Sequence, residues 1–239
     1  MIHKRRLALA FTAATVATTL AAPAQALVFN LGDLISNNQS ITVGDKEFGN
    51  FECIISQTGT TTPNSCNSIN VQTKDDDPFG LLFQTGFSAR STSTNPSSSL
   101  DVFLAYDITV LDPNKRLDSA LLKFDGSGSP PSALANDDVL AKVTQTIKAM
   151  DNTTVGTAEV FAPPANNKTD QVSLDQKLAK ARVENQINIE AKNGARGFIS
   201  VVENRYEQTE VPEPGTIGGL LAVGSLGIGS ILKQFKQKK

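Results

Sequence analysis

A strict alternation of apolar and polar side chains runs through the middle of this 239-residue chain and leaves it few folds to choose from. In the clearest run, Leu100–Val110, one side carries Val102, Leu104, Tyr106, Ile108 and Val110. The other side carries Asp101, Ala105, Asp107 and Thr109, with Phe103 as its one large apolar residue. Residues 139–149 and 183–192 alternate in the same way. Because successive side chains of a strand point to opposite faces, these runs predict antiparallel strands buried on one face only.

Clusters of glycine, proline, aspartate and asparagine separate these runs and predict turns. They are Gly44-Asp45, Lys74–Pro78, Leu111–Asn114, Asp125–Pro131 and Asn193–Gly197, the last of which we expect to be a hairpin turn. The segment Leu174–Ala181 fits either a helical turn or a strand, and no segment of residues 27–210 clearly predicts a helix. Eight to ten strands with short turns predict an all-β domain over residues 27–210, an antiparallel β-sandwich of jelly-roll type.

The chain has no histidine after His3, and this removes several classes of chemistry. Ser–His–Asp and Cys–His catalysis need an imidazole, and so do histidine-bound zinc, copper and iron sites. Residues 27–210 also contain no glycine-rich nucleotide-binding pattern. They hold 15 lysines and arginines against 23 aspartates and glutamates, so their net charge of about −8 argues against nucleic acid as a partner. We therefore expect a protein that is not an enzyme and has no resident cofactor.

The first 26 residues have the three parts of a secretory signal peptide. A basic start is followed by the apolar segment Leu7–Leu20 and by the small-x-small site Ala24-Gln25-Ala26. The basic residues are Lys4, Arg5 and Arg6. We expect export by Sec-type machinery with cleavage after Ala26, and an uncleaved membrane anchor is the alternative.

The other end of the chain, residues 211–236, combines a motif, an apolar span and a basic tail. Two prolines fix the backbone of Val211-Pro212-Glu213-Pro214 in an extended, accessible form. Residues 216–232 contain no ionisable group, and as a helix they would be roughly 26 Å long, enough to cross a bilayer. The tail is expected to stop transfer and stay cytoplasmic through Lys233, Lys236, Lys238 and Lys239. The alternative is a buried, glycine-rich helix of the globular domain.

These features together resemble the PEP-CTERM sorting signal of exported bacterial proteins. The resemblance implies that an exosortase, a membrane-embedded cysteine protease, recognises Pro212, Glu213 and Pro214 and cleaves near them. It also implies anchoring at the inner membrane first, then display at the cell surface or release outside the cell. The segments 41–51 and 101–110 resemble a recurrent ectodomain of such proteins, which implies no activity.

The only two cysteines, Cys53 and Cys66, enclose a short loop rich in Thr, Ser and Asn. In an exported protein such a pair is expected to oxidise. The loop-entropy estimate for a closure of this size is roughly 3 kcal/mol of stabilisation. A catalytic or metal-binding thiol is the alternative, but the chain offers it no histidine partner.

Three further groups of side chains are candidate sites. Asp75–Asp77 and Asn136–Asp138 are oxygen-rich runs that are candidates for weak calcium binding, with solvated turns as the alternative. Asp101 and Asp107 share the polar face of one strand, but at roughly 20 Å apart they are too distant to be a catalytic pair, and we expect surface charges. A glycan-binding patch would need exposed rings at Tyr106, Tyr206 or Phe103.

We therefore predict an exported cell-surface or extracellular-matrix protein, sorted through its C-terminal motif and anchored in the membrane by its C-terminal helix. Its ectodomain is expected to be structural or adhesive, with exopolysaccharide as a partner. The alternatives are a secreted carbohydrate-active enzyme and a glycan-binding module. Such an enzyme should show a cleft with two carboxylates about 5–10 Å apart.

Overall fold

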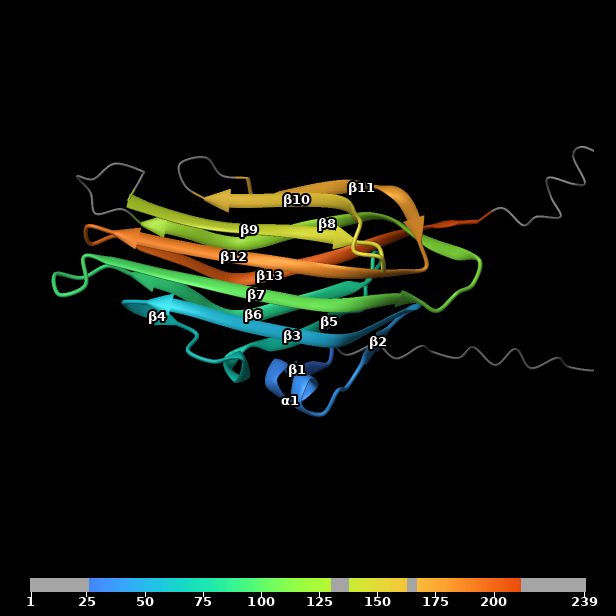
Figure 1. Cartoon of the computed structure of the whole chain (residues 1–239), viewed down its shortest axis with the longest axis horizontal. Coiled ribbons are helices and arrows are strands. Elements are labelled where there is room, and N and C mark those ends of the chain that lie inside the picture. Colours follow the sequence, from blue (N-terminus) through green and yellow to red (C-terminus); the bar gives the residue numbers. More distant parts are fainter. Residues whose placement is uncertain (1–25, 130–137, 163–166, 212–239) are drawn as a thin grey trace, which may run out of the picture.

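Two antiparallel sheets stacked face to face form the fold, as a computed structural model of the chain shows (Figure 1). The structure describes residues 26–129, 138–162 and 167–211. Its elements are β1 (Val28–Asn30), α1 (Leu31–Ser36), β2 (Ile41–Val43), β3 (Lys46–Thr58), β4 (Thr60–Thr62), the 3-10 helix η1 (Cys66–Ser68), β5 (Asn70–Lys74), β6 (Gly80–Arg90), β7 (Ser97–Val110), β8 (Lys115–Ser129), β9 (Val139–Lys148), β10 (Thr154–Ala162), β11 (Thr169–Leu178), β12 (Lys180–Lys192) and β13 (Arg196–Glu210). The first sheet has the order β1-β5-β6-β13-β8-β11, with β4 also paired to β6, and the second has the order β10-β9-β12-β7-β3-β2.

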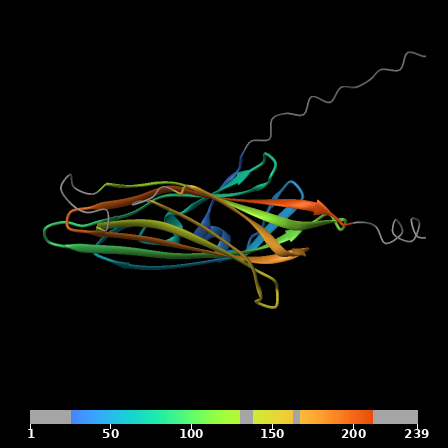
Figure 2. The same ribbon diagram turned by 90° about the horizontal axis from the view of Figure 1, so that it is seen from above.

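The alternating runs form strands whose apolar side lies between the two sheets, as predicted. Strands β7, β9 and β12 bury every second side chain, and apart from the buried Ala105 of β7 the residues between them are half-buried or exposed on the outer face. The buried apolar side chains of both sheets belong to one hydrophobic cluster. Burial of this apolar surface is the main force that holds the sheets together. Seen from above, the strands of both sheets follow the long dimension of the domain (Figure 2).

The segment Asn193–Gly197 was expected to be a hairpin turn, and this prediction is wrong. Strand β12 pairs with β7 and β9 in the second sheet, whereas β13 pairs with β6 and β8 in the first. The turn, with positive φ at Asn193 (52°) and Gly194 (85°), therefore carries the chain from one sheet to the other. Both hydrogen-bonding edges of β12 are already occupied, so β13 cannot pair with it and buries its apolar face from the opposite sheet.

The segment Leu174–Ala181, which fitted a helix or a strand, is extended. Strand β11 ends at Leu178 and β12 begins at Lys180, and the pairing of β11 with β8 shifts register between Ser173 and Leu178. The helix that the sequence did not predict is α1, which lies at the edge of the sandwich near β1 (Figure 1). The Asn30 side chain caps it by accepting from the Asp33 N–H.

The predicted disulfide is confirmed. Cys53 in β3 and Cys66 in η1 are joined, with their Cα atoms 6.1 Å apart. Because β3 belongs to the second sheet and η1 leads into β5 of the first, the bond ties the connection between the sheets. The described residues contain no free cysteine.

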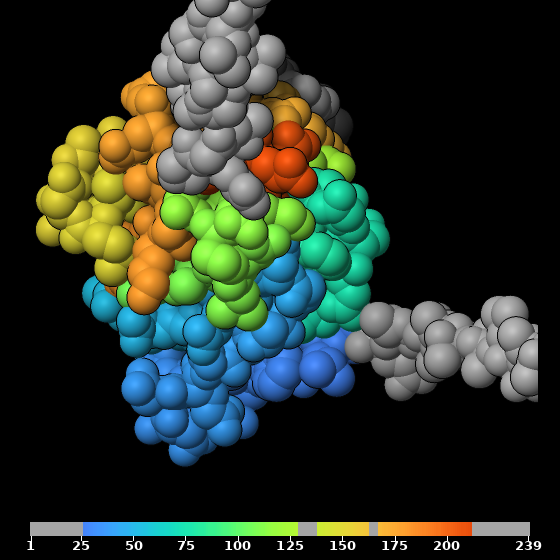
Figure 3. Space-filling model, turned by 90° about the vertical axis from the view of Figure 1, so that its right-hand side faces the viewer, coloured from blue at the N-terminus to red at the C-terminus, as the bar shows by residue number. Residues whose placement is uncertain are grey.

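At one end of the sandwich, turns from both sheets meet (Figure 3). The Leu111 N–H donates to the Asp45 carbonyl at 2.8 Å, which joins the β7–β8 turn to the β2–β3 turn. The chain leaves the described domain near this end, where the Val211 N–H donates to the Asn114 carbonyl at 2.7 Å. Among the residues that the structure describes, no helix has the length and apolar character needed to cross a membrane.

Candidate functional site

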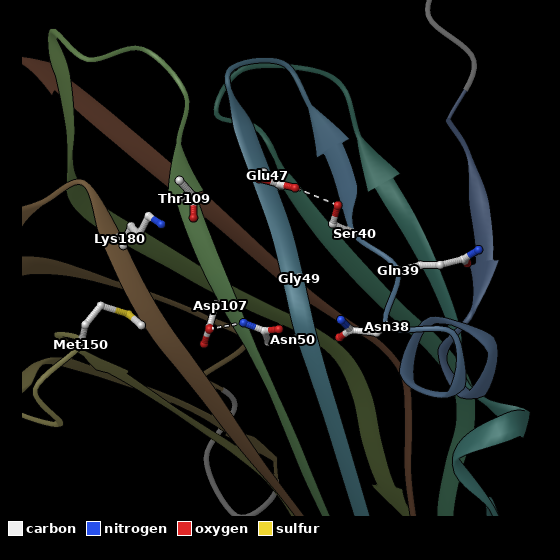
Figure 4. Close-up of a pocket in the computed structure, with 10 residues that line it drawn as sticks. All are labelled: Asn38, Gln39, Ser40, Glu47, Gly49, Asn50, Asp107, Thr109, Met150 and Lys180. Atoms are coloured by element: carbon white, nitrogen blue, oxygen red, sulfur yellow. Dashed lines mark hydrogen bonds between the residues drawn. The ribbon is translucent and has the colours of Figure 1, made fainter.

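A polar cleft opens on the outer face of the second sheet, near the end where β2 and β3 turn (Figure 4). Its volume is about 390 Å³. The residues that line it come from the α1–β2 loop, β3, β7, the β9–β10 turn and the start of β12. They are Asn38, Gln39, Ser40, Glu47, Gly49, Asn50, Asp107, Thr109, Met150 and Lys180.

A bulge in β3 shapes the floor of the cleft. The pairing of β3 with β7 shifts register between Gly49 and Glu52, and Asn50 adopts a positive φ of 52°. Asparagine tolerates this left-handed conformation better than most residues do. As a result, Asn50 points to the cleft, while Phe51 turns inward and packs against Tyr106 with ring centroids 5.8 Å apart.

One carboxylate in the cleft, that of Asp107, accepts hydrogen bonds from two neighbouring side chains. Asp107 accepts from Asn50 Nδ2 at 2.7 Å and from Arg182 Nη1 at 3.0 Å. Arg182 also contacts Glu52 at 2.7 Å and donates to the Asn50 carbonyl at 3.1 Å. Burial lowers the pKa of Arg182, but Asp107 and Glu52 outweigh it and raise that pKa, so the guanidinium stays charged. Asn50 and Arg182 thus hold the Asp107 side chain in place.

The second carboxylate of the cleft, Glu47, accepts from Ser40 Oγ at 2.8 Å. Around it lie hydroxyl, amide and ammonium groups from Asn38, Gln39, Thr109 and Lys180, and Met150 is 58% exposed at the rim. Such a mixture of hydrogen-bond donors and acceptors suits a hydroxylated, uncharged ligand. Within residues 26–129, 138–162 and 167–211, no group of three or more His, Cys, Asp or Glu side chains is arranged to hold a metal ion.

From the sequence, Asp101 and Asp107 were both expected to be surface charges on one strand, but in the structure their surroundings differ. Asp107 lines the cleft, whereas Asp101 lies further along β7 and accepts from Asn188. Sequence reasoning missed Asn38, Asn50 and Glu47 as members of one site. The signal in the sequence is the residue type alone: asparagine is enriched at positive φ, the conformation that Asn38 and Asn50 share.

The aspartate run expected as a calcium candidate forms the β5–β6 turn. Asp76 contacts Lys74 Nζ at 3.0 Å and Arg205 Nη1 at 2.9 Å. Hydrogen bonds from Lys74 and Arg205 lower the pKa of Asp76 to about 2. In the second run, Asp138 accepts from Asn193 Nδ2 at 2.8 Å, and the other two residues lie outside the described ranges.

Two of the three rings at which a glycan-binding patch was considered are not exposed. Tyr106 and Tyr206 are 0% and 1% exposed and lie between the sheets. Their hydroxyls form a hydrogen bond with each other within the core, on the apolar side of their strands. Of the three rings, Phe103 alone is partly exposed, opposite the exposed Ile54 of β3.

A buried lysine lies at the end of the sandwich where β3 begins. Lys46 is 2% exposed, its ammonium lies 5.0 Å from the centre of the Phe79 ring, and it contacts Asp45 Oδ1 at 3.0 Å. Burial lowers the pKa of Lys46 despite the bond to Asp45. Burial also raises the pKa of Asp45, but its bonds to Lys46 and Lys115 outweigh this and lower it. This cluster joins the ends of β3 and β8.

Most of the predicted sorting residues lie outside the described residues. This holds for Pro212, Glu213, Pro214, the four tail lysines and Ala24, while Ala26 and Val211 are described.

Comparison with known proteins finds no matching family model and no matching curated protein. Among solved structures, the chain is similar to the enzymatically active domain of tailspike protein 4 from bacteriophage CBA120 (TM-score 0.30, 13% identity, 65% of this chain and 19% of that one). It is also similar to TmCBM61 in complex with β-1,4-galactotriose (TM-score 0.32, 12% identity, 65% of this chain and 88% of that one). A third similar structure is the arabinose-bound α-L-arabinofuranosidase MgGH51 (TM-score 0.22, 10% identity, 62% of this chain and 25% of that one). The chain thus spans 19% of the tailspike domain and 25% of the arabinofuranosidase. Similarities this distant carry no argument about function.

Proposed function

We propose that the protein is an exported cell-surface or extracellular-matrix component, whose β-sandwich has a structural or adhesive role in an exopolysaccharide matrix. The chain is delivered by a signal peptide and sorted through the motif that begins at Val211. Its partners are Sec-type export machinery, an exosortase-type enzyme, the membrane and matrix polysaccharide.

The Cys53–Cys66 disulfide supports export, because such bonds persist in oxidising compartments. The two chain ends support it too, through the signal-peptide pattern and the resemblance to the PEP-CTERM signal. The sorting motif directly follows β13, which ends at Glu210. Cleavage near Pro212–Pro214 would therefore leave the whole sandwich intact.

The polar cleft is the observation that carries the adhesive role. It offers preorganised hydrogen-bonding groups, since Asp107 is fixed by Asn50 and Arg182 while Thr109 and Lys180 line the opening. Such groups hold a sugar polymer by hydrogen bonds spread over several residues, without any chemical step.

A carbohydrate-active enzyme is the second candidate, because Glu47 and Asp107 both line the cleft. A glycosidase needs one carboxyl that is protonated and able to donate. Asp107 instead forms an ion pair with Arg182, and a carboxylate held in place in this way suits hydrogen bonding to the hydroxyl groups of a ligand.

Two experiments test the proposal. Intact mass of the protein from fractionated native culture should begin at Leu27 and end near Pro212–Pro214, outside the membrane. A mass that runs through Lys239 in the membrane fraction would refute the sorting step.

Binding of the full chain to a panel of soluble polysaccharides tests the cleft. We expect Thr109→Ala and Lys180→Ala to weaken retention, while Thr144→Ala, on the same outer face but outside the lining of the cleft, should not. Equal retention of all three variants would refute the cleft as the contact surface. Release of shortened sugars would favour the enzyme.

A further inference from the structure

Five polar side chains meet at one level between the two sheets. Gln145, Asn185 and Tyr106 come from β9, β12 and β7 of the second sheet, and Asn204 and Tyr206 come from β13 of the first. All five are 0–1% exposed. The register explains the meeting, because Asn185 pairs directly with Gln145 and lies two residues from the partner of Tyr106 on β12.

The hydrogen bonds within this cluster leave one tyrosine hydroxyl proton without an acceptor. The two tyrosine hydroxyl oxygens are 2.5 Å apart. Asn204 Nδ2 donates to the Tyr106 oxygen at 2.9 Å, and Gln145 Nε2 donates to the Tyr206 oxygen at 3.4 Å. Burial raises the pKa of both tyrosines, so both hydroxyls keep their protons. Only one of these protons can lie between the two oxygens, and the other needs a further acceptor.

Four more polar atoms of the cluster have no hydrogen-bond partner among the described residues. They are Gln145 Oε1, Asn185 Oδ1, Asn185 Nδ2 and Asn204 Oδ1. The Asn185 amide lies near the Tyr106 hydroxyl without meeting the geometry of a hydrogen bond. Buried polar atoms are nearly always paired, because an unpaired one loses its hydration and gains nothing in return.

We propose that this cluster is an internal water-binding site. At least one water molecule donates to the amide oxygens of Gln145, Asn185 or Asn204 and accepts from Asn185 Nδ2 or from the remaining tyrosine proton. The site offers the two to four polar partners that a buried water requires.

The chemistry of the cluster favours water over a metal cation. The side chains are neutral, and a cation would face the hydrogens of the Asn185 amide and the remaining tyrosine proton, whereas water pairs with donors and acceptors alike. Three rings surround Tyr106 with centroids 5.7–6.0 Å away, those of Phe48, Phe51 and Phe83. Because all five side chains of the cluster are at most 1% exposed, the bound water should exchange slowly.

Water-to-protein cross-relaxation in NMR spectra of the full chain tests this directly. We expect rotating-frame cross-peaks from water to the side-chain amide protons of Gln145, Asn185 and Asn204. Absence of these cross-peaks in the wild-type protein would overturn the proposal, even if no variant can be purified.

A pair of variants on strand β12 sharpens the test. Asn185→Leu should abolish the remaining water cross-peaks to Gln145 and Asn204 and leave the urea midpoint unchanged or lower. Asn188→Leu, at an outward-facing position of the same strand, should keep all the cross-peaks. A higher urea midpoint for Asn185→Leu would mean that the amide is dry and unpaired, which contradicts the proposal. Retention of every cross-peak in Asn185→Leu would contradict it as well.

Discussion

Breaking the Cys53–Cys66 bond should cost the domain a large part of its stability. The cysteines are 13 residues apart in sequence. The chain-entropy model gives about 3 kcal/mol for a loop of this size. With a urea dependence of about 2 kcal/mol per molar, the unfolding midpoint should fall by about 1.5 M.

The assay is urea unfolding of the full chain, followed by tyrosine fluorescence, with and without a reducing agent. Reduction of the wild type isolates the cross-link. Cys53→Ala/Cys66→Ala also removes the packing of Cys53 against the core, so it should be at least as unstable. The double variant should not respond to the reducing agent, which makes it the matched control. A midpoint shift below about 0.3 M on reduction would refute the reasoning, because it would mean that the loop is just as constrained without the bond.

Three further predictions concern single contacts. Asp76→Asn should lower stability near neutral pH, because the charged carboxylate of Asp76 stabilises the folded state and its pKa there is lowered to about 2. The difference in urea midpoint from wild type should vanish as pH falls from about 4 to about 2, because the wild-type carboxyl then becomes protonated. Tyr106→Phe and Tyr206→Phe should each lower the free energy of unfolding by about 1–3 kcal/mol, because each leaves the buried hydroxyl of the other tyrosine without its partner. The double variant should lose less than the sum of the two, and additive losses in a double-mutant cycle would contradict the coupling of the hydroxyls. Gly80→Ala should lower the free energy of unfolding by about 3 kcal/mol, because the added Cβ would lie 2.0 Å from a backbone oxygen of β13. Gly86→Ala is the control, since its Cβ would lie 3.5 Å from the nearest side chain and should be tolerated. Similar melting temperatures for the two variants would contradict the close approach at Gly80.

Local patterns predicted the strands and several turns but not which strands pair. The alternation in β7 and β12 determines which side chains are buried, because burial on one face follows from period two. It contains no information on whether β12 pairs with β13. That choice depends on β7 and β9 occupying both edges of β12, and β7 is distant in sequence.

The candidate site was harder to predict than the fold for the same reason. Asp107 was noticed on its strand, but Asn50 and Arg182, which hold it, are 57 and 75 residues away. Tyr106 was correctly placed on the apolar side of its strand, yet the partner that allows its hydroxyl to be buried is 100 residues further along the chain. The jelly-roll connectivity, the signal peptide and the transmembrane helix stay predictions.

The last strand of the domain occupies the middle of the first sheet, between β6 and β8, and the strand before it occupies the middle of the second. If the protein is exported as proposed, a chain that emerges from a membrane pore with its N-terminus first can complete neither sheet until its final strands have crossed. Until then, β1, β5 and β6 remain separated from β8 and β11, and loop closure over such distances is slow. This order of events would keep the polypeptide unfolded during transport, and a product truncated before Arg196 should be degraded rather than accumulate as a smaller folded domain.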